Sequence, residues 1–208
     1  MSKVLLINGS PNEFGCTYTG LKEVADVLEK RGIDTEMLHI GSGPIPGCNG
    51  CNACVKTGRC RHDDDKVNYI LDNLDSYDGM VIGSPVYYAA ASGQVTAFLD
   101  RLFWAGGYRM RGKVGAAIAS CRRAGSTVTL DQLYKYFAIS AMPIATSQYW
   151  TMVHGNTPDE VRQDLEGMQV MRCLGENMAW LISCICAGKA AAVPAPEREK
   201  RVRTNFIR

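Results

Sequence analysis

The sequence predicts an α/β protein in which helices cover both faces of a parallel β-sheet. Short apolar runs alternate along the chain with longer segments whose apolar residues recur every three or four positions. Continuous apolar runs are typical of parallel strands buried on both faces, and the second pattern is typical of amphipathic helices. Five strands joined by crossover helices predict a three-layer, doubly wound sheet of strand order 2-1-3-4-5.

The expected elements follow one another along the chain, separated by loops rich in Gly, Ser, Pro and Asn. The five expected strands span residues 4–8, 34–40, 80–83, 114–120 and 141–146. Apolar stripes at helical spacing predict helices around residues 21–28, 67–74, 95–102, 126–137 and 161–185. Three aspartates at residues 63–65 precede the second of these helices, and we expect them to interact with the positive end of its dipole.

The bulk composition is that of one soluble globular domain. The chain has 208 residues, of which 46% are apolar and 21% charged, and its net charge is +2. This small charge does not favour a nucleic acid or a membrane surface as partner. We find neither an apolar run of about 18 residues nor a signal peptide, and therefore expect a cytoplasmic protein. We expect one domain at residues 1–193 and a basic C-terminal tail at residues 194–208.

The loop at residues 9–17 has the composition of an anion-binding loop at the start of a helix. The first N–H groups of a helix have no intrahelical partner, and the helix dipole is positive there. Ser10 and Thr17 add hydroxyl donors, and Asn12 adds an amide donor. An ordinary strand-to-helix turn is the alternative. The chain has neither Gly-Lys-Ser/Thr after such a loop nor G-x-G-x-x-G, which excludes the nucleotide-binding P-loop and the dinucleotide fingerprint.

Four cysteines in the expected loop at residues 44–62 have the spacing of a shared metal centre. The pattern is Cys48-x2-Cys51-x2-Cys54-x5-Cys60. Thiolates three residues apart can converge on one centre, and a [4Fe–4S] cluster needs four of them. Zinc is an alternative, although its usual cysteine pairs lie further apart; free thiols or disulfides are another. The odd total of nine cysteines, with four in one short window, favours a reducing compartment.

Several short motifs occur in a fixed order along the chain. They are Gly9-Ser10-Pro11 with Thr17, the cysteine loop, and residues 83–88, 98–101, 122–125 and 204–208. In order and spacing they resemble the flavodoxin-like NADPH-dependent FMN reductases and, within them, the iron–sulfur flavoproteins. This resemblance implies a flavodoxin-like fold, bound FMN, and a homodimer or homotetramer.

The same resemblance implies which residues surround the flavin. Around the FMN phosphate it implies Ser10, Asn12, Cys16 and Thr17. Along the edge of the isoalloxazine ring it implies Pro85, Val86, Tyr87 and Tyr88, and on the other side Ser120, Arg122, Gly125 and Ser126.

Simple chemistry supports some of these roles. Reduced flavin carries negative charge near N1 and O2, which Arg122 or Arg123 would stabilise; a surface role is the alternative. Tyr87 offers an aromatic face to the ring, with core packing as the alternative for this tyrosine pair. Tyr87, Trp150 and His154 form a candidate substrate wall, although His154 also fits an ordinary structural role.

We therefore expect an FMN-dependent oxidoreductase without a catalytic side chain, because the flavin carries the chemistry. The resemblance implies NAD(P)H as co-substrate. As partner we expect a small-molecule acceptor such as a quinone, or a ferredoxin-like protein, with electrons passing through a [4Fe–4S] cluster. A non-enzymatic electron carrier and a redox sensor are the alternatives. The cysteine loop follows the second strand, so we expect it on the flavin side of the molecule, near a flavin of the same or a neighbouring subunit.

Overall fold

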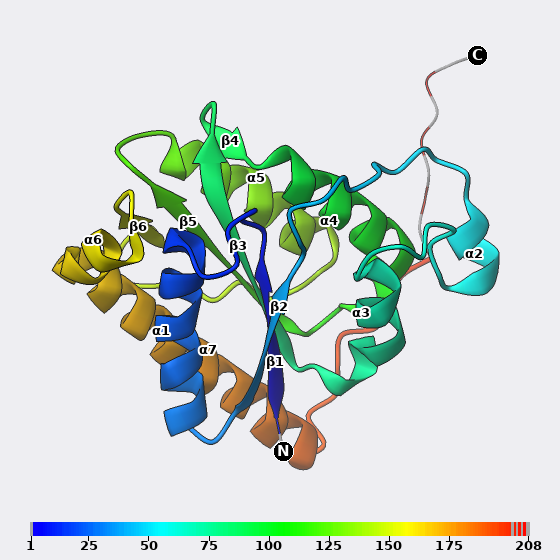
Figure 1. Cartoon of the computed structure of the whole chain (residues 1–208). Helices are drawn as coiled ribbons and strands as arrows, with labels where there is room; N and C mark the ends of the chain where they lie inside the picture. The colour runs from blue at the N-terminus through cyan, green and yellow to red at the C-terminus, as the bar shows by residue number, and fades with distance from the viewer. Residues whose placement is uncertain (1, 201, 203, 205, 207–208) are drawn as a thin grey trace.

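A central parallel sheet runs through the computed structural model, which describes residues 2–200, 202, 204 and 206 (Figure 1). Its parallel strands are β1 (Lys3–Asn8), β2 (Asp34–His39), β3 (Gly79–Tyr87), β5 (Val114–Cys121) and β6 (Met152–His154). They lie in the order β2-β1-β3-β5-β6, which confirms the predicted order of the first four strands; the fifth place is taken by β6 and not by the segment expected there. A sixth strand, β4 (Ala90–Ala91), was not predicted; it pairs antiparallel with the end of β3.

Helices cover both faces of the sheet, as the sequence predicts. One face carries α1 (Cys16–Lys30), α6 (Pro158–Gln163) and α7 (Leu165–Ala190), and the other carries α3 (Val67–Asn73), α4 (Gly93–Gly106) and α5 (Ser126–Ile139). Short helices lie in the connections: α2 (Ala53–Thr57), η1 (Leu74–Ser76) and η2 (Gly107–Arg109).

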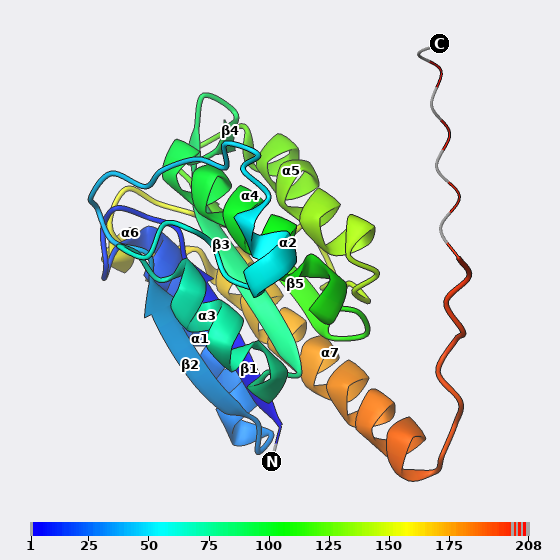
Figure 2. The same ribbon diagram turned by 90° about the vertical axis from the view of Figure 1, so that its right-hand side faces the viewer.

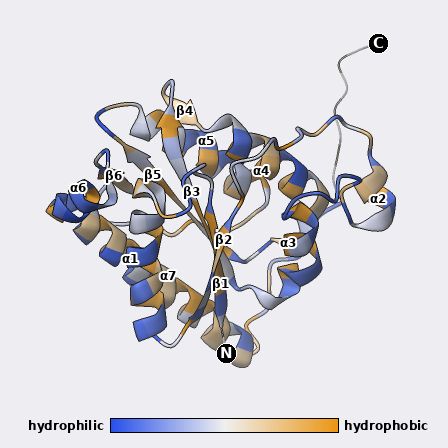
Figure 3. Ribbon diagram, viewed as in Figure 1, coloured by the Kyte–Doolittle hydropathy of each residue, from blue (hydrophilic) through white to orange (hydrophobic). Residues whose placement is uncertain are grey.

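Alternation along the strands divides the core into two layers. In β1, Val4 and Leu6 pack with α1 and α7, whereas Leu5 and Ile7 pack with α3, α4 and α5. Hydrophobic residues are concentrated in the strands and on the inner sides of the helices, and hydrophilic ones on the outer sides (Figure 3). The sheet is therefore buried on both faces. Ligands can reach it only at the ends of its strands.

The prediction of a fifth strand at residues 141–146 is wrong. There the structure has an isolated bridge between Gly115 and Ile144, and the edge strand β6 forms later. Ala141 has a positive φ of 54°, and Pro143 has no N–H to donate, so a regular ladder does not extend through this segment. The chain leaves the sheet and rejoins it where the Ala119 N–H donates to the Thr151 carbonyl at 3.0 Å.

The expected last helix is two helices, because Asp164 interrupts it. The Asp164 side chain accepts from the Gly167 N–H at 2.9 Å and caps the start of α7. Among the described helices, α7 is long and apolar enough to span a membrane by length and composition alone. Its inner residues Met171, Leu174 and Met178 are fully buried in the core, as expected of a core helix of a soluble protein.

The chain after α7 has no helix or strand among its described residues and runs away from the helix end (Figure 2). Arg111 contacts this segment by donating to the Pro196 carbonyl at 2.8 Å. Of the C-terminal motif at residues 204–208, positions 205, 207 and 208 lie outside the described residues, as do 201 and 203 in the expected tail. The division into a domain at 1–193 and a tail at 194–208 stays a prediction.

Candidate functional site

Three loops leave the sheet side by side at the carboxyl ends of β1, β3 and β5. The first is the loop at residues 9–15 before α1, the second is the β3–β4 hairpin, and the third is the loop at residues 122–125 before α5. The Gly9 N–H donates to the Gly83 carbonyl at 2.8 Å, and Pro85 is opposite Ser120 in the sheet. Neighbouring parallel strands thus bring the sequence-predicted flavin residues of all three loops to one edge.

The loop at residues 9–15 is shaped by a buried asparagine that sequence analysis missed. Asn8, at the end of β1, accepts from the Ser10 N–H at 3.1 Å and donates to the Glu13 carbonyl at 2.8 Å. The Ser10 hydroxyl accepts from the Asn12 N–H at 3.1 Å, and His39 of β2 contacts the Ser10 carbonyl at 2.8 Å. These bonds fix the loop before any ligand binds.

The start of α1 is open to an anion. Its N-cap is Gly15, which has no side chain, and no side-chain cap bond is made there. Thr17 lies in this first turn and is 1% exposed as a residue, and its hydroxyl bonds the Ser120 hydroxyl at 2.8 Å. A Cβ at Gly83 would lie 2.8 Å from the Thr17 Cγ2, so Gly83 permits this close approach of α1 and β3. Uncapped N–H groups beside two hydroxyls form an arrangement suited to a phosphate.

The second loop is a tight hairpin of two residues between β3 and β4. Tyr88 and Ala89 have positive φ values of 52° and 56°, as in a type I′ turn, and Tyr87 pairs with Ala90. A left-handed backbone is costly for a residue with a large side chain, and such strain concentrates at functional sites. Tyr88 is fully exposed at the tip and Tyr87 is about half exposed, so core packing is excluded for both.

The third loop touches the hairpin through Gly125. Its φ is +88°, and a Cβ there would lie 2.8 Å from the Ala89 Cα and 2.9 Å from the Val86 Cγ1. Arg122 and Arg123 precede it and are exposed. The β3–β4 hairpin and the loop at residues 122–125 therefore pack against each other. The exposed guanidinium groups of Arg122 and Arg123 lie in position to contact a ligand bound beside these loops.

Some predicted flavin residues have other contacts in the structure. The half-buried Cys16 thiol lies 3.6 Å from the Gly155 carbonyl, and burial raises its pKa. Ser126 is buried, and its hydroxyl lies 3.0 Å from the Met152 sulfur. Asn12 is exposed, and Pro85 is half-buried. Among the predicted flavin residues, Thr17 and Ser120 are thus the pair whose side chains contact each other directly.

Two residues of the candidate substrate wall lie nearer the outer edge of the sheet. His154 is opposite Cys121 in the sheet, and its Nδ1 lies 3.3 Å from the Asp164 carboxylate, which also accepts from the His154 N–H at 2.8 Å. Trp150 is exposed and makes an edge contact with Tyr149, with ring centroids 4.7 Å apart. The histidine therefore has a structural partner, and no polar contact joins either side chain to Tyr87 among the described residues.

The cysteine loop starts at the carboxyl end of β2 but does not stay there. Its cysteines line a cavity of about 20 Å³ together with Arg101, Trp104 and Ala105 of α4. These three residues lie 8 to 12 positions after Gly93, the first residue of α4. At 1.5 Å per residue this is roughly 12–18 Å along the helix from the flavin edge. The cysteines thus lie along α4 beyond its first two turns, and their nearness to a flavin of the same or a neighbouring subunit stays a prediction.

The four thiols line one cavity, but their sulfur atoms do not lie close enough together to bind a single metal ion. Cys48 and Cys51 are exposed, and Cys54 and Cys60 are half-buried. Within the described ranges no three Cys, His, Asp or Glu side chains form a ready metal site. Burial raises the pKa of Cys54, and the other three thiols add to this rise. Four soft sulfur ligands around one cavity fit an iron–sulfur centre chemically, but a cavity with room for about one water requires the loop to open.

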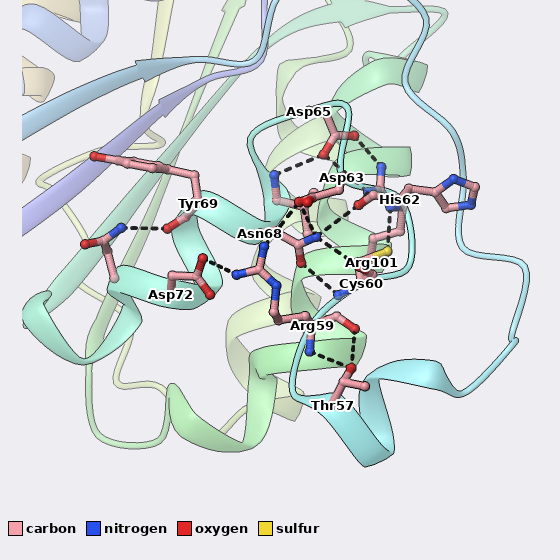
Figure 4. Close-up of polar contacts among 12 residues, drawn as sticks. Thr57, Arg59, Cys60, His62, Asp63, Asp65, Asn68, Tyr69, Asp72 and Arg101 are labelled. Carbon is pink, nitrogen blue, oxygen red and sulfur yellow. Dashed lines mark hydrogen bonds and ion pairs between the residues drawn. The ribbon is translucent and has the colours of Figure 1, made fainter.

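Two buried polar residues hold the end of this loop, and sequence analysis gave neither a role (Figure 4). Asn68 of α3 accepts from the Cys60 N–H at 2.8 Å and donates to the Cys60 carbonyl at 2.9 Å. Arg101 of α4 donates from Nε to the Cys60 sulfur at 3.2 Å and forms an ion pair with Asp65. Burial alone would lower the pKa of Arg101, but its bonds to Asp65 and Cys60 raise it. The aspartates before α3 thus bind side chains as well as the helix start.

Signals for these residues were present in the sequence. Arg101 closes one of the resemblance motifs, at residues 98–101, on the apolar stripe of its helix. Asn68 likewise adjoins the stripe residue Val67. A charged or amide side chain on a buried stripe requires a partner, because an unpaired one costs several kcal/mol by general estimates. The sequence does not show which segment supplies that partner.

Comparisons with known proteins show what this chain is similar to. The model of the family described as NADPH-dependent FMN reductase matches residues 2–157. An iron-sulfur flavoprotein of Methanocaldococcus jannaschii is 32% identical over 191 residues, which is 88% of this chain and 98% of that protein. A more distant relative, an NAD(P)H dehydrogenase (quinone) of Acidithiobacillus ferrooxidans, is 30% identical over 98 residues, 42% of this chain and 48% of that protein.

A solved structure has the same fold. The crystal structure of RosB with bound 8-demethyl-8-formylriboflavin-5'-phosphate superposes with a TM-score of 0.71 at 15% identity, over 100% of this chain and 94% of that chain. The two proteins thus share a fold at low sequence identity. This is expected, because a fold depends on how helices pack on the sheet and many different residues allow the same packing.

Proposed function

This chain belongs to the NADPH-dependent FMN reductase family, and from that we propose that it is an FMN-dependent oxidoreductase that accepts electrons from NAD(P)H. The observation that carries the proposal is the uncapped start of α1 beside the buried Thr17–Ser120 hydroxyl pair. A terminal phosphate is the part of FMN that distinguishes it from riboflavin, and this arrangement suits a phosphate.

The chain's own groups divide the work of binding. The loop at residues 9–17 binds the phosphate through N–H groups and the Thr17 hydroxyl. The hairpin at Tyr87 and Tyr88 covers one edge of the ring, and Gly125 allows the third loop to close against it. Arg122 or Arg123 stabilises negative charge on the reduced ring. When bound, the flavin supplies electron transfer, and the protein supplies position, charge and access.

The proposed acceptor is a small molecule of the quinone class, with a ferredoxin-like protein as the alternative partner. The name of the Acidithiobacillus ferrooxidans relative, an NAD(P)H dehydrogenase (quinone), supports this choice of donor and acceptor. Turnover of NADPH or NADH with a quinone supports the enzyme. Reduction by ferredoxin alone would instead make the protein an electron carrier.

We also propose that Cys48, Cys51, Cys54 and Cys60 hold a [4Fe–4S] centre. The support is the donor set around one cavity and the printed name of the Methanocaldococcus jannaschii relative. Such a centre would supply one-electron chemistry beside the flavin. Its binding requires the exposed part of the loop to open, since the present cavity is only about 20 Å³.

A homodimer or homotetramer in the cytoplasm completes the proposal. The cysteines lie beyond the first two turns of α4, and in this proposal a flavin bound by a second copy lies close to them. Trp104 and Tyr108 next to the loop are exposed aromatic residues, which are common in protein interfaces. Sedimentation that finds a fully active monomer would contradict this assembly.

The decisive experiment is anaerobic purification followed by an absorption spectrum, flavin identification, and iron, sulfide and zinc analysis. We expect FMN, with about four irons and four sulfides per chain if the cluster is [4Fe–4S]. Cys51→Ser should lose the iron and keep FMN, because the two sites use different loops. Cys184→Ser, at an exposed cysteine outside the loop, is the matched control and should keep both. Iron-free wild-type protein would refute the cluster, and protein without FMN would refute the function.

A further inference from the structure

We propose that Arg101 is a positioning residue for the cysteine site: it holds both ends of the cysteine loop together and sets the electrostatic environment of the Cys60 sulfur. This inference rests on the proposed function for its iron–sulfur part. Its claim about the loop concerns the protein alone and is tested without iron. Nothing in the flavin site requires Arg101, which lies more than two helical turns from the start of α4.

Arg101 is buried, and its donors bond to the loop and to the segment just after it. Its side chain is 1% exposed. Nε donates to the Cys60 sulfur at 3.2 Å, Nη1 donates to the Pro46 carbonyl at 3.3 Å, and Nη2 donates to the His62 carbonyl at 3.1 Å. Both Nη atoms also bond the Asp65 carboxylate. A buried guanidinium with all its partners in one segment organises that segment.

The partners of Arg101 lie on both sides of the cysteines. Pro46 precedes Cys48, while His62 and Asp65 follow Cys60. Asp65 in turn accepts from the Val67 N–H at 3.0 Å, which joins the loop end to the start of α3. Arg101 therefore closes the loop into a ring, with α3 and α4 as its rigid base.

Apart from the Asn68 bonds at Cys60 and the surface ion pairs of Arg59, the loop has few contacts that hold it. The short helix α2, which contains Cys54, buries no residue. Cys48 and Cys51 are exposed. Loss of the Arg101 contacts would thus free the loop at residues 46–60 to move, because few apolar contacts oppose local opening.

Cys60 differs from the other three thiols. Among the described residues it is the loop cysteine whose sulfur accepts a side-chain hydrogen bond, and Asn68 fixes its backbone on both sides. A charge-assisted hydrogen bond to a thiolate stabilises negative charge on the sulfur, and hydrogen bonds to the sulfurs of iron–sulfur centres tune their reduction potentials. Cys60 would therefore be the ligand whose position is fixed, and Cys48, Cys51 and Cys54 would bind the same centre from the less constrained part of the loop.

The test uses the full-length protein with two changes at this residue. Arg101→Met alone would leave the buried Asp65 carboxylate unpaired and risks misfolding. The double variant Arg101→Met/Asp65→Asn removes both charges and avoids this. Arg101→Lys keeps the charge but cannot donate to Asp65 and Cys60 in the same fork geometry. Arg59→Met is the matched control, because Arg59 lies in the same loop and pairs with Asp63 and Asp72 at the surface.

Amide hydrogen exchange of iron-free protein decides the loop claim. In the double variant, we expect exchange in residues 46–65 at least tenfold faster than in wild type, with unchanged exchange in the flavin loops and unchanged FMN affinity. Arg59→Met should exchange as wild type. Unchanged exchange in the double variant would overturn the proposal, whether or not the protein holds iron.

Anaerobic reconstitution with iron and sulfide then tests the role in the metal site. We expect at least a fivefold lower iron content in the double variant than in wild type. In Arg101→Lys we expect retained iron with a more negative reduction potential, because the hydrogen bond to the Cys60 sulfur is lost. A wild-type potential in Arg101→Lys would overturn the Cys60 role. If wild type takes up no iron, the proposed function fails, and hydrogen exchange still decides the loop claim.

Discussion

Thr17→Val should weaken the binding of FMN much more than that of riboflavin. Thr17 lies in the first turn of α1 and is 1% exposed, and the substitution preserves the shape of its side chain while removing the hydroxyl. No side chain caps this helix start, so we expect the FMN phosphate to accept from the Thr17 hydroxyl as well as from the backbone. Riboflavin lacks the phosphate and cannot make this contact.

The size of the effect follows from the kind of hydrogen bond that is lost. A hydrogen bond to a charged group contributes about 1.5–3 kcal/mol, which corresponds to roughly 10- to 150-fold weaker FMN binding. In the free protein the same hydroxyl bonds Ser120 at 2.8 Å. Loss of this neutral bond should cost about 1 kcal/mol of stability and lower Tm by roughly 2–4 °C.

The assay is a fluorescence titration of apoprotein with FMN and with riboflavin, with Tm measured in parallel. Thr19→Val is the matched control, because Thr19 is also buried and its hydroxyl donates to the Gly15 carbonyl at 3.1 Å. We expect this control to lower Tm similarly and to leave the ratio of the two affinities unchanged. Equal losses of FMN and riboflavin affinity in Thr17→Val would refute the assignment of a phosphate to this loop.

Two further predictions concern the flavin edge and the opposite end of the sheet. Gly125→Ala should weaken flavin binding and lower the free energy of unfolding by about 1–2 kcal/mol or more. The reason is that φ at this position is +88° and a Cβ would lie 2.8 Å from the Ala89 Cα. FMN titration and denaturation curves of the variant that match those of wild type would contradict this. Burial alone would raise the pKa of Glu36, but hydrogen bonds from Lys3 and two tyrosines lower it below 4.5. The carboxylate therefore stabilises the folded state above pH 4.5, and this contribution is lost as pH falls through the folded pKa. Glu36→Gln should be less stable by about 1–2 kcal/mol at pH 7, and urea unfolding should show the difference shrinking below pH 4.5; a constant difference would exclude the carboxylate as its source.

Local patterns were sufficient to predict most of the fold. The buried run of β1 and the stripe Leu21, Val24, Ala25 and Leu28 of α1 lie where the sequence predicts them, because period and burial are linked within a few residues. The strand order followed from the handedness and shortness of crossover connections. The fifth strand was wrong because pairing at a sheet edge depends on the neighbour as well as on apolar content, and Pro143 and Ala141 do not continue the ladder.

The loop at residues 9–17 is predicted as an anion site from sequence because a helix start has unpaired N–H groups whatever its surroundings, and the uncapped start of α1 fits this prediction. Its partner could not be derived from local spacing: Ser120 is 103 residues from Thr17, and only adjacent strands bring their hydroxyls to 2.8 Å. Asn8 was missed for the same reason, since a polar residue at a strand end does not show in sequence which loop it will bond.

The sequence by itself determined the α/β class, four of the five parallel strands, the composition of the loop at residues 9–17 and the four-cysteine pattern. Each depends on residues close together in the chain, whose spacing dictates local geometry. Only the tertiary structure decided where the cysteines lie. Arg101 is 41 residues from Cys60 and 55 from Pro46, and its bonds to both hold the cysteine loop against α4. A buried guanidinium must be paired, and the folded chain determines which distant groups it reaches.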